Sequence, residues 1–377
     1  MADVDSNSVV AGADALEPVV GPVGEVLRAV LDERVAQLTA NDPALATLGR
    51  EVRRLVQNGG KRLRPAFVYW GHRATGADHD DMLVTAGAAV ELLHAFALIQ
   101  DDVMDRSSRR RGEPTVHEVL AADYRAGDLR VDSERRSDRP ATAAHGDPAW
   151  FGYSAAILAS DLAVAWSTEV LAEAPVQPDR TDRVRRLFAD LRVEVIGGQY
   201  LDLRLAGLDD ATADDALRVA LLKSGRYTVT RPLQLGAAIG ETTDEVDRVL
   251  AVYGDAIGVA FQLRDDVLGL FGDPDRTGKS AVSDIREGKR TMLVIAALER
   301  ANELQRSVLL ETLGDPDVDE TGADRVRQIV EETGTLAYVE DLAAERQDTA
   351  RQALTTLPDP ARTALGQLAD LVVSRSS

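Results

Sequence analysis

The chain has no cysteine among its 377 residues. Disulfides, thiol catalysis and cysteine-based zinc sites are therefore excluded, and we expect a reducing, cytoplasmic location. Aromatic residues make up only 4% of the sequence, and alternating β-branched patterns are rare. Alanine, leucine and arginine are abundant instead, which predicts an all-α fold.

Positive charge is also scarce, because 43 lysines and arginines face 63 aspartates and glutamates, for a net charge of −20. This balance argues against nucleic acid or an anionic membrane surface as a partner. The first residues lack a basic, apolar leader, so we expect no signal peptide. We also expect no transmembrane segment, since Glu91 and His94 interrupt the best apolar stretch.

The pattern along the chain predicts one large domain with two irregular segments. Residues 1–20 are small, acidic and aperiodic, which predicts a mobile tail. Pro22 is then expected to open the first helix of a single domain over residues 21–377. Residues 122–147 lack apolar periodicity, which predicts a surface insertion.

An apolar run over residues 85–99 predicts a buried helix that ends in Asp101, Asp102 and Asp105. On a helix, Asp101 and Asp105 lie one turn apart on the same face. Like charges at such a position require a neutralising cation, and oxygen ligands of this kind suit Mg²⁺ completed by substrate phosphates. Arginines follow at 106 and 109–111 and suit diphosphate. Taken alone, the motif is also compatible with a solvated helix end.

A second pair, Asp265 and Asp266, lies on another apolar helix at residues 246–270 and favours the metal interpretation. Two such clusters can share metal ions across a cavity. Other candidate anion sites are the basic turn Lys61–Arg64, where an ordinary basic turn is the alternative, and Lys223 with Ser224, where the alternative is a surface lysine. Pro232 should kink or break the helix that carries this pair.

With these pieces together, the chain resembles the trans-isoprenyl diphosphate synthases, the polyprenyl synthetase family, and is most like the short-chain geranylgeranyl diphosphate synthases. The motifs that carry the resemblance span about residues 22–300. They are Gly59-Gly60-Lys61-Arg62-Leu63-Arg64-Pro65, Glu91 to Asp105, Arg110-Arg111-Gly112, Gly198-Gln199-Tyr200-Leu201-Asp202, Lys223-Ser224, and Phe261 to Asp266 with Lys279 and Lys289. The resemblance implies an all-α single-domain bundle around a deep central cavity (the isoprenoid synthase fold), usually homodimeric.

The resemblance also implies two diphosphate sites. The implied ligands of Mg²⁺, for which Mn²⁺ can substitute, are Asp101, Asp105 and Asp265, supported through water by Asp102, Asp266 and Asp284. The implied contacts of the allylic diphosphate are Arg110, Lys223, Lys279 and Lys289. The implied contacts of isopentenyl diphosphate, held without metal, are Lys61, Arg64, His94 and Arg111. Gln262 and Ser224 are implied to lie near the breaking C–O bond, with Lys223 and the ligand aspartates completing the catalytic set.

The implied function is a prenyltransferase that condenses isopentenyl diphosphate with dimethylallyl, geranyl or farnesyl diphosphate, most often to geranylgeranyl diphosphate. Phe96 with its small neighbour Ala97 resembles the pocket floor of a twenty-carbon enzyme. Farnesyl or longer-chain synthases, a class I terpene cyclase and a subunit of a heteromeric synthase remain alternatives. The chain departs from the family pattern at three positions, where Gly269 replaces a frequent third aspartate, Gln100 a histidine and Ser224 a threonine.

Overall fold

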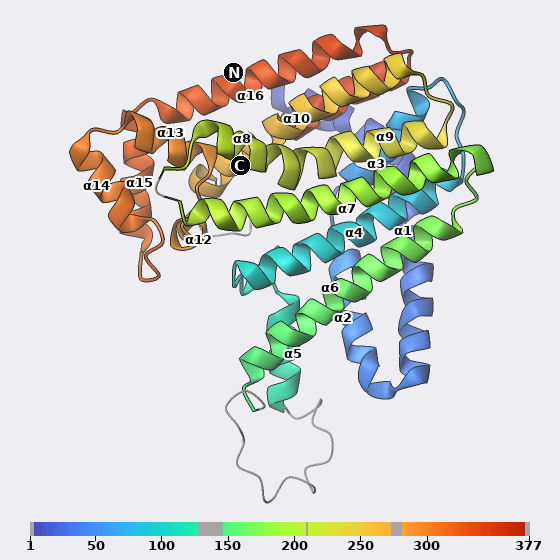
Figure 1. Ribbon diagram of the computed structural model, residues 1–377, viewed down its shortest axis with the longest axis horizontal. Coiled ribbons are helices and arrows are strands. Elements are labelled where there is room, and N and C mark those ends of the chain that lie inside the picture. Colours follow the sequence, from blue (N-terminus) through green and yellow to red (C-terminus); the bar gives the residue numbers. More distant parts are fainter. Residues whose placement is uncertain (1–3, 127–145, 209, 273–280, 374–377) are drawn as a thin grey trace, which may run out of the picture. The chain divides into compact units, whose positions relative to one another are not determined.

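The computed structural model describes residues 4–126, 146–208, 210–272 and 281–373. Over these residues the chain is almost entirely helical (Figure 1), which confirms the predicted all-α class. The described strands are two residues each, β1 (Arg109–Arg110) and β2 (Glu113–Pro114), and they form one antiparallel hairpin.

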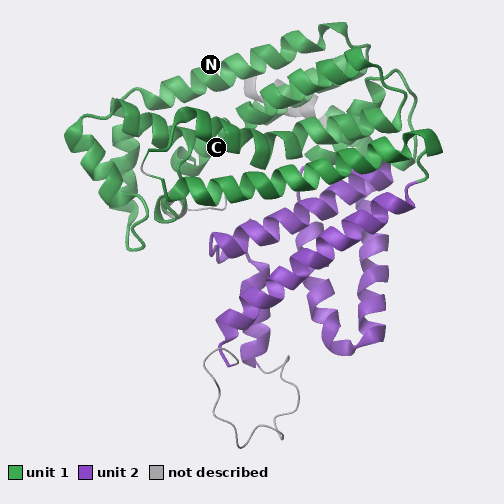
Figure 2. Ribbon diagram, in the orientation of Figure 1, with its two compact units in different colours: residues 1–19, 62–83, 175–377 green, residues 20–61, 84–174 purple. Residues whose placement is uncertain are grey.

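The chain divides into two compact units, which Figure 2 shows in different colours. Unit 1 comprises residues 1–19, 62–83 and 175–377, and unit 2 comprises residues 20–61 and 84–174. The chain passes between them at four points, so neither unit is a continuous stretch of sequence. The single domain over residues 21–377 stays a prediction.

Unit 2 contains most of α1 (Val4–Asn41) and of α4 (Met82–Met104). Its other elements are η1 (Pro43–Leu45), α2 (Ala46–Gln57), the β1–β2 hairpin, α5 (Val116–Ala126) and α6 (Pro148–Glu173). Helix α6 packs against α2 and α5, and α2 also packs against α5. The predicted insertion at residues 122–147 begins too early, because residues 122–126 complete α5, and residues 127–145 lie outside the described residues.

Helix α1 corrects the prediction of a tail up to residue 20 that ends where Pro22 opens a helix. The described helix begins at Val4 and continues through both Pro18 and Pro22. Ala15 and Val19 are buried and continue the apolar stripe of Val23 by steps of four residues. In addition, Trp70 Nε1 donates to the Ala15 carbonyl at 2.7 Å. Burial of this stripe outweighs the two backbone hydrogen bonds that the prolines remove.

Unit 1 contains α3 (Leu63–Arg73) and the helices from residue 178 onward. These are α7 (Pro178–Ala206), α8 (Ala213–Val219), η3 (Ala220–Thr230), α9 (Arg231–Ile239), α10 (Asp244–Phe271), α12 (Ala281–Arg286), α13 (Met292–Arg300), α14 (Glu303–Thr312), α15 (Glu320–Glu332), α16 (Thr335–Ala353), η4 (Leu354–Thr356) and α17 (Ala361–Val373). Helix α3 packs against α9, η3 packs between α7 and α10, and α10 also packs against α16.

Segment η3 is a π-helix of 11 residues, and it corrects the prediction that Pro232 breaks the helix there. The chain stays helical from Ala213 to Ile239, while its hydrogen-bond register changes from α to π and back. Pro232 falls in the first turn of α9, where a missing N–H is tolerated. π-Helical turns inside α-helices occur frequently at functional sites.

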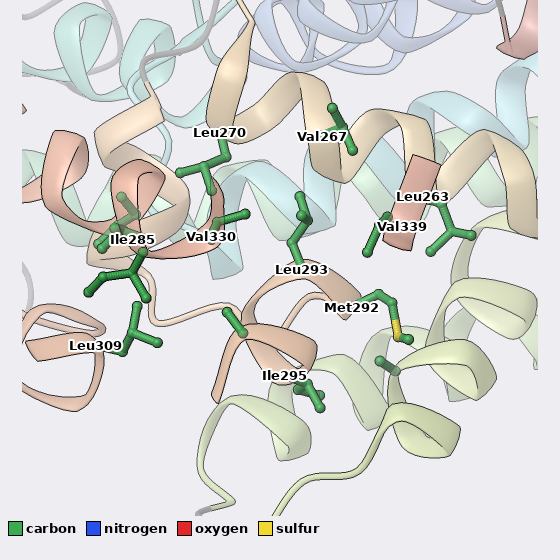
Figure 3. Packing of buried hydrophobic residues seen from close by; sticks show 14 of the residues in the cluster. Leu263, Val267, Leu270, Ile285, Met292, Leu293, Ile295, Leu309, Val330 and Val339 are labelled. Carbon is green, nitrogen blue, oxygen red and sulfur yellow. The ribbon is translucent and has the colours of Figure 1, made fainter. Parts of the chain in front are cut away.

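One hydrophobic cluster of unit 1 fixes α10 against the C-terminal helices (Figure 3). It joins buried residues of α10, α12, α13, α14, α15 and α16, among them Leu263, Val267, Leu270, Ile285, Met292, Leu293, Ile295, Leu309, Val330 and Val339. Leu263, Val267 and Leu270 recur at spacings of four and three residues, so one face of α10 is committed to this core. The polar residues between them, Asp265 and Asp266, lie off that face.

Two helices, α4 and α6, are long and apolar enough to cross a membrane by length and composition. Glu91 and His94 lie inside the apolar stretch of α4, as the sequence indicates. The apolar window of α4 is 78% buried inside the protein and that of α6 is 50% buried, and core helices of soluble proteins pass the same test. The absence of a membrane-spanning segment stays a prediction.

Candidate active site

The first aspartate cluster, in unit 2, lies at the C-terminal end of α4. The helix ends where Arg106 adopts a left-handed conformation with φ 52°, and Ser107 N donates to the Asp102 carbonyl at 3.0 Å. This is the pattern of a Schellman cap. It fixes Asp101 and Asp102 in the last turn and places Asp105 directly after it.

Asp102 is 2% exposed and is bound on both oxygens by Arg110 Nε, at 2.9 and 3.0 Å. Arg110 Nη2 also approaches Asp101 Oδ2 at 3.3 Å. Burial by itself lowers the pKa of Arg110, but the hydrogen bonds and charge of Asp102 outweigh it, so the pKa is raised. Asp102 is therefore committed to Arg110, in keeping with a supporting role rather than that of a metal ligand.

The β1–β2 hairpin presents the two arginines of this region. Arg110 pairs with Glu113, and the two-residue turn between them, Arg111-Gly112, has φ values of 55° and 79°. Positive φ at both positions is the requirement of a type I′ turn, whose twist matches that of the strands. The hairpin therefore holds Arg110 and Arg111 in fixed, successive positions.

The hairpin is attached to the end of α2 at two points. Arg111 Nη1 donates to the Gly59 carbonyl at 2.7 Å, and Arg54 Nη2 donates to the Pro114 carbonyl at 3.0 Å. A pocket with a volume of about 40 Å³ opens here, lined by Arg54, Asn58, Asp102, Arg110 and Arg111 among others. Lys61 is exposed and follows directly after Gly59 and Gly60. Lys61, the first residue of the predicted anion-binding turn, thus lies in the same unit as the arginine pair, whereas Arg64 belongs to unit 1.

The remaining predicted residues of unit 2 lie on α4. His94 and Ala97 are half-buried, and Phe96 is 9% exposed. Gln100, one of the departures from the family pattern, donates from Nε2 to Ser160 Oγ at 2.7 Å. That hydrogen bond joins α4 to α6, so Gln100 stabilises the packing of these two helices.

The second aspartate cluster, in unit 1, is presented by α10. Thr243 caps the start of this helix by accepting from Val246 N. Near the other end, Gln262 Nε2 donates to Asp266 Oδ1 at 2.7 Å. Burial, together with the negative charges of Asp284, Asp265 and Asp202, raises the pKa of Asp266 to about 7 despite this hydrogen bond.

Asp284 of α12 explains the glycine that stands in place of a third aspartate. A Cβ added at Gly269 would lie 2.6 Å from Asp284 Oδ2, too close for a side chain without a shift of that carboxylate. The space beside Asp266 is thus filled by a carboxylate from another helix. Lys289 partly balances it, with Nζ 3.6 Å from Asp284 Oδ1 and 2.7 Å from Glu287 Oε2.

Lys223 and Ser224 both lie in the π-helix η3 and are half-buried. Lys223 Nζ donates to Asp202 Oδ2 of α7 at 2.6 Å. A Cβ at Gly198 would lie 2.3 Å from Lys223 N, so only glycine allows α7 to approach this closely. The Gly198-to-Asp202 motif therefore works as a unit, with the glycine admitting the π-helix and the aspartate binding its lysine.

Arg64 of α3 is bound to the same π-helix. Its Nη2 donates to Thr228 Oγ1 at 2.8 Å, and its guanidinium carbon lies 4.3 Å from the centre of the Tyr227 ring. Sequence reasoning did not select Tyr227 or Thr228, although both follow Lys223 by one helical turn. Lys279, the remaining predicted basic residue, lies outside the described residues.

The two clusters fit a divalent cation by their donor chemistry. Both offer carboxylate oxygens, and burial together with neighbouring carboxylates raises the pKa of Asp266. No group of three potential ligands in metal-binding geometry occurs within residues 4–126, 146–208, 210–272 and 281–373. Mg²⁺ commonly takes only one or two carboxylates and completes its shell with water and substrate phosphates.

Taken together, the helical fold, the aspartate clusters and the flanking basic side chains suit an all-α enzyme that acts on diphosphates. The family model for polyprenyl synthetase matches residues 46–333. The chain belongs to the polyprenyl synthetase family, and the predicted prenyltransferase activity is thereby confirmed.

Individual relatives agree with this placement. A short chain isoprenyl diphosphate synthase of Methanothermobacter thermautotrophicus is 32% identical over 91% of this chain and 95% of its own. A geranylgeranyl diphosphate synthase of Methanosarcina mazei is 33% identical, covering 86% of this chain and 88% of its own. The crystal structure of a geranylgeranyl pyrophosphate synthase from Corynebacterium glutamicum, complexed with isoprenyl diphosphate and magnesium, superposes with a TM-score of 0.82. It is 34% identical over 94% of this chain and 98% of its own. This likeness confirms the predicted isoprenoid synthase fold.

Proposed function

We propose that this chain is a Mg²⁺-dependent synthase that joins isopentenyl diphosphate to an allylic diphosphate and makes geranylgeranyl diphosphate. The observation that supports it most is the carboxylate cluster of Asp265, Asp266 and Asp284, in which burial and neighbouring carboxylates raise the pKa of Asp266 and Lys289 Nζ lies 3.6 Å from Asp284. Such a cluster favours a divalent cation that brings a diphosphate with it. The Corynebacterium relative, crystallised with magnesium and isoprenyl diphosphate, adds support.

The proposed sites divide the basic residues between two substrates. The allylic diphosphate is assigned to the metal ligands Asp101, Asp105 and Asp265 and to the cations Arg110, Lys223, Lys279 and Lys289. Isopentenyl diphosphate is assigned to Lys61, Arg64, His94 and Arg111. In support of this division, Arg111 is bound beside the glycine turn that precedes Lys61, whereas Lys223 is bound by Asp202.

The chemistry requires loss of diphosphate from the allylic carbon. Mg²⁺ supplies charge stabilisation to the departing diphosphate. Lys223, oriented by Asp202, adds a fixed positive charge that gains strength as the C–O bond breaks. Gln262 and Ser224 are proposed to lie beside that bond, and the apolar wall of α4 is proposed to exclude water from the cation. The double bond of isopentenyl diphosphate then attacks, and the proton it loses passes to the departed diphosphate.

Product length is assigned to Phe96 and Ala97 of α4. The growing chain is proposed to run along α4 away from Asp101, so that Phe96 forms the floor. Several relatives are geranylgeranyl diphosphate synthases, which supports twenty carbons, while one from Aeropyrum pernix is a geranylfarnesyl diphosphate synthase. Phe96→Ala should lengthen the product and Ala97→Phe should shorten it toward farnesyl diphosphate.

The deciding experiment is incubation with Mg²⁺, isopentenyl diphosphate and each allylic starter, followed by mass spectrometry of the products. Geranylgeranyl diphosphate supports the proposal. A cyclic hydrocarbon made without consumption of isopentenyl diphosphate would instead identify a terpene cyclase. Activity that appears only with a second, different chain would identify a subunit of a heteromeric synthase.

We further propose a cytoplasmic homodimer. Helix α7 carries a stripe of exposed apolar side chains at spacings of three and four residues, Val193, Ile196, Tyr200 and Leu203, which are 70%, 54%, 65% and 48% exposed in the single chain. A continuous stripe of this kind favours burial against a second copy. Light scattering after gel filtration should give twice the chain mass of 40.6 kDa. The Ile196→Glu variant should give the mass of a single chain.

A further inference from the structure

Arg64 is fixed by two neighbouring residues of the π-helix η3. Its Nη2 donates to Thr228 Oγ1 at 2.8 Å, and its guanidinium carbon lies 4.3 Å from the centre of the Tyr227 ring. Thr228 is 1% exposed and Tyr227 is 4% exposed, so both are held firmly by their surroundings. The guanidinium therefore has one edge bound by a hydroxyl and one face covered by an aromatic ring.

This arrangement leaves Arg64 ready for an anion. Its Nε is buried and has no hydrogen-bond partner in the described part of the chain. A buried N–H without a partner costs free energy, which a phosphate oxygen would recover. Arginine also loses considerable rotamer freedom when it is fixed, and the hydroxyl and the ring remove that freedom before a ligand arrives.

The π-helix places these two residues one turn from Lys223. Hydrogen bonds in a π-helix join residue i to residue i+5, and Tyr227 and Thr228 follow Lys223 by four and five residues. The same turn therefore presents Lys223, which is bound to Asp202, and the pair that fixes Arg64. Cations proposed for two different substrates are thus set by one short helical segment.

The segment is anchored separately by charged residues on α7 and α10. Arg226 Nη2 lies 3.2 Å from Asp255 Oδ2, and Arg226 Nη1 lies 3.2 Å from Glu194 Oε1. Thr230 Oγ1 also donates to Asp255 Oδ1 at 2.7 Å. Because these bonds do not involve Arg64, loss of the Thr228 hydroxyl should release Arg64 without releasing the helix.

We infer that Thr228 and Tyr227 are positioning residues for isopentenyl diphosphate, which act by orienting Arg64 through its hydrogen bond and its ring contact. The inference rests on the proposed function, in which Arg64 binds that substrate. It adds two residues that touch neither substrate in this assignment and that connect the arginine of one site to the lysine of the other.

The test is a set of steady-state measurements on matched threonine variants. Thr228→Val keeps the shape and removes the acceptor, so the KM for isopentenyl diphosphate should rise about 5- to 20-fold. The KM for the allylic substrate and kcat should stay within about twofold of the wild type. Thr228→Ser, which retains a hydroxyl, should restore most of the affinity. Thr230→Val is the control, because it removes a buried hydroxyl of the same segment that binds Asp255 and not Arg64.

Tyr227 provides a second, independent variant should Thr228→Val fold poorly, as judged by its circular dichroism melting curve. Tyr227→Leu should raise the KM for isopentenyl diphosphate about 3- to 10-fold, whereas Tyr227→Phe, which retains the ring, should resemble the wild type. In the double variant Arg64→Ala with Thr228→Val, the KM should match that of Arg64→Ala alone, because both changes remove the same interaction.

Three results would overturn the inference. The first is an equal rise of both substrate KM values in Thr228→Val, or the same change in Thr230→Val, since either would indicate general damage. The second is additive loss in the double variant. The third is a normal KM for isopentenyl diphosphate in Thr228→Val and Tyr227→Leu while Arg64→Ala weakens it, which refutes the positioning role and leaves the proposed function intact. A normal KM in Arg64→Ala itself would overturn the proposed substrate assignment and this inference together.

Discussion

The two aspartate clusters look alike in sequence but differ in how their charge is balanced. In unit 2, Asp102 is buried and accepts from Arg110 on both oxygens. In unit 1, Asp266 accepts from the neutral amide of Gln262, and the charges that act on it most are carboxylates. The pKa of Arg110 is raised by its partner, while burial and like charges raise the pKa of Asp266 to about 7.

The first cluster is therefore preformed, because an arginine of the fold balances its buried charge. For the second cluster we expect a bound cation to do so. An ion pair built into the fold keeps the first cluster in place whether or not metal is present. In the second cluster Asp266 keeps its proton up to about pH 7, so we expect a divalent ion bound there to contribute to stability as well as to catalysis. The adjacent aspartate pair that both clusters contain therefore has two distinct energetic roles.

The largest expected effect is on turnover. Asp101→Ala and Asp265→Ala each remove a proposed metal ligand and should lower kcat on the order of 10³-fold or more. Both proteins should remain folded, because Arg110 keeps its main partner, Asp102, in each variant. Product formation under saturating Mg²⁺ measures the first expectation and thermal melting the second. Near-normal turnover in either variant would contradict the metal assignment.

Much of this site could be predicted from residue types and spacing. The carboxylates, the arginine pair and Lys223 with Ser224 stand at spacings that require a helix end, a turn or a shared face. Spacing along the sequence does not show which residue of another element each side chain contacts. Asp102 gives no sign in the sequence that it is bound to Arg110, and nothing at Gly269 indicates that Asp284 lies beside it.

The errors at the level of the fold have a common physical origin. The sequence predicts a helix start at Pro22 and a kink or break at Pro232, because local propensity disfavours proline inside a helix. In the first case burial of Ala15 and Val19 continues the helix, and in the second a π-helix changes the register before the proline. Tertiary packing decided both, and packing is not visible in a short window of sequence.

The next effect in size tests the preformed cluster. Asp102→Ala leaves the guanidinium of Arg110 buried without its main partner and should lower the free energy of unfolding by about 3–5 kcal/mol. Urea denaturation of the metal-free protein measures this loss. The double variant with Arg110→Met should recover much of it, because the uncompensated charge is gone. If Asp102→Ala cost less than Asp101→Ala, the ion pair with Arg110 would not be the feature that holds this cluster.

The pH dependence of stability tests the second cluster. Asp266 binds a proton more tightly in the folded state, so its contribution to stability is complete below pH 4 and is lost as the pH rises toward about 7. The slope is at most about 1.4 kcal/mol per pH unit, and we expect a total of about 2–4 kcal/mol because the side chain is half-buried. Asp266→Asn should remove this loss in the metal-free protein.

Denaturant melts of the wild type and Asp266→Asn at pH 5 and pH 8 measure the difference. The variant should gain stability relative to the wild type as the pH rises. Asp102→Asn is the matched comparison and should gain nothing, because Asp102 is paired with Arg110. Parallel curves for the wild type and Asp266→Asn would mean that the second cluster is balanced already.

The smallest expected effect comes from Gly269, where the two clusters can be made more alike or less alike by one side chain. Gly269→Ala should be nearly neutral, since the helix propensity it gains of about 1 kcal/mol offsets the shift it forces on Asp284. Gly269→Asp adds a further carboxylate beside Asp284 and should lower the stability of the metal-free protein by about 1–2 kcal/mol at pH 8. Gly269→Asn has the same shape without the charge and is the control.

Adding Mg²⁺ with inorganic diphosphate should stabilise Gly269→Asp more than its control, Gly269→Asn. A cation that neutralises the cluster gains from the extra carboxylate, so the rise in Tm on addition should be larger for Gly269→Asp than for Gly269→Asn. Thermal melting with and without the two additives measures it. An equal rise in both variants would mean that the added charge does not reach the metal, and that Asp284 supports the cluster by filling space beside α10 and not by its charge.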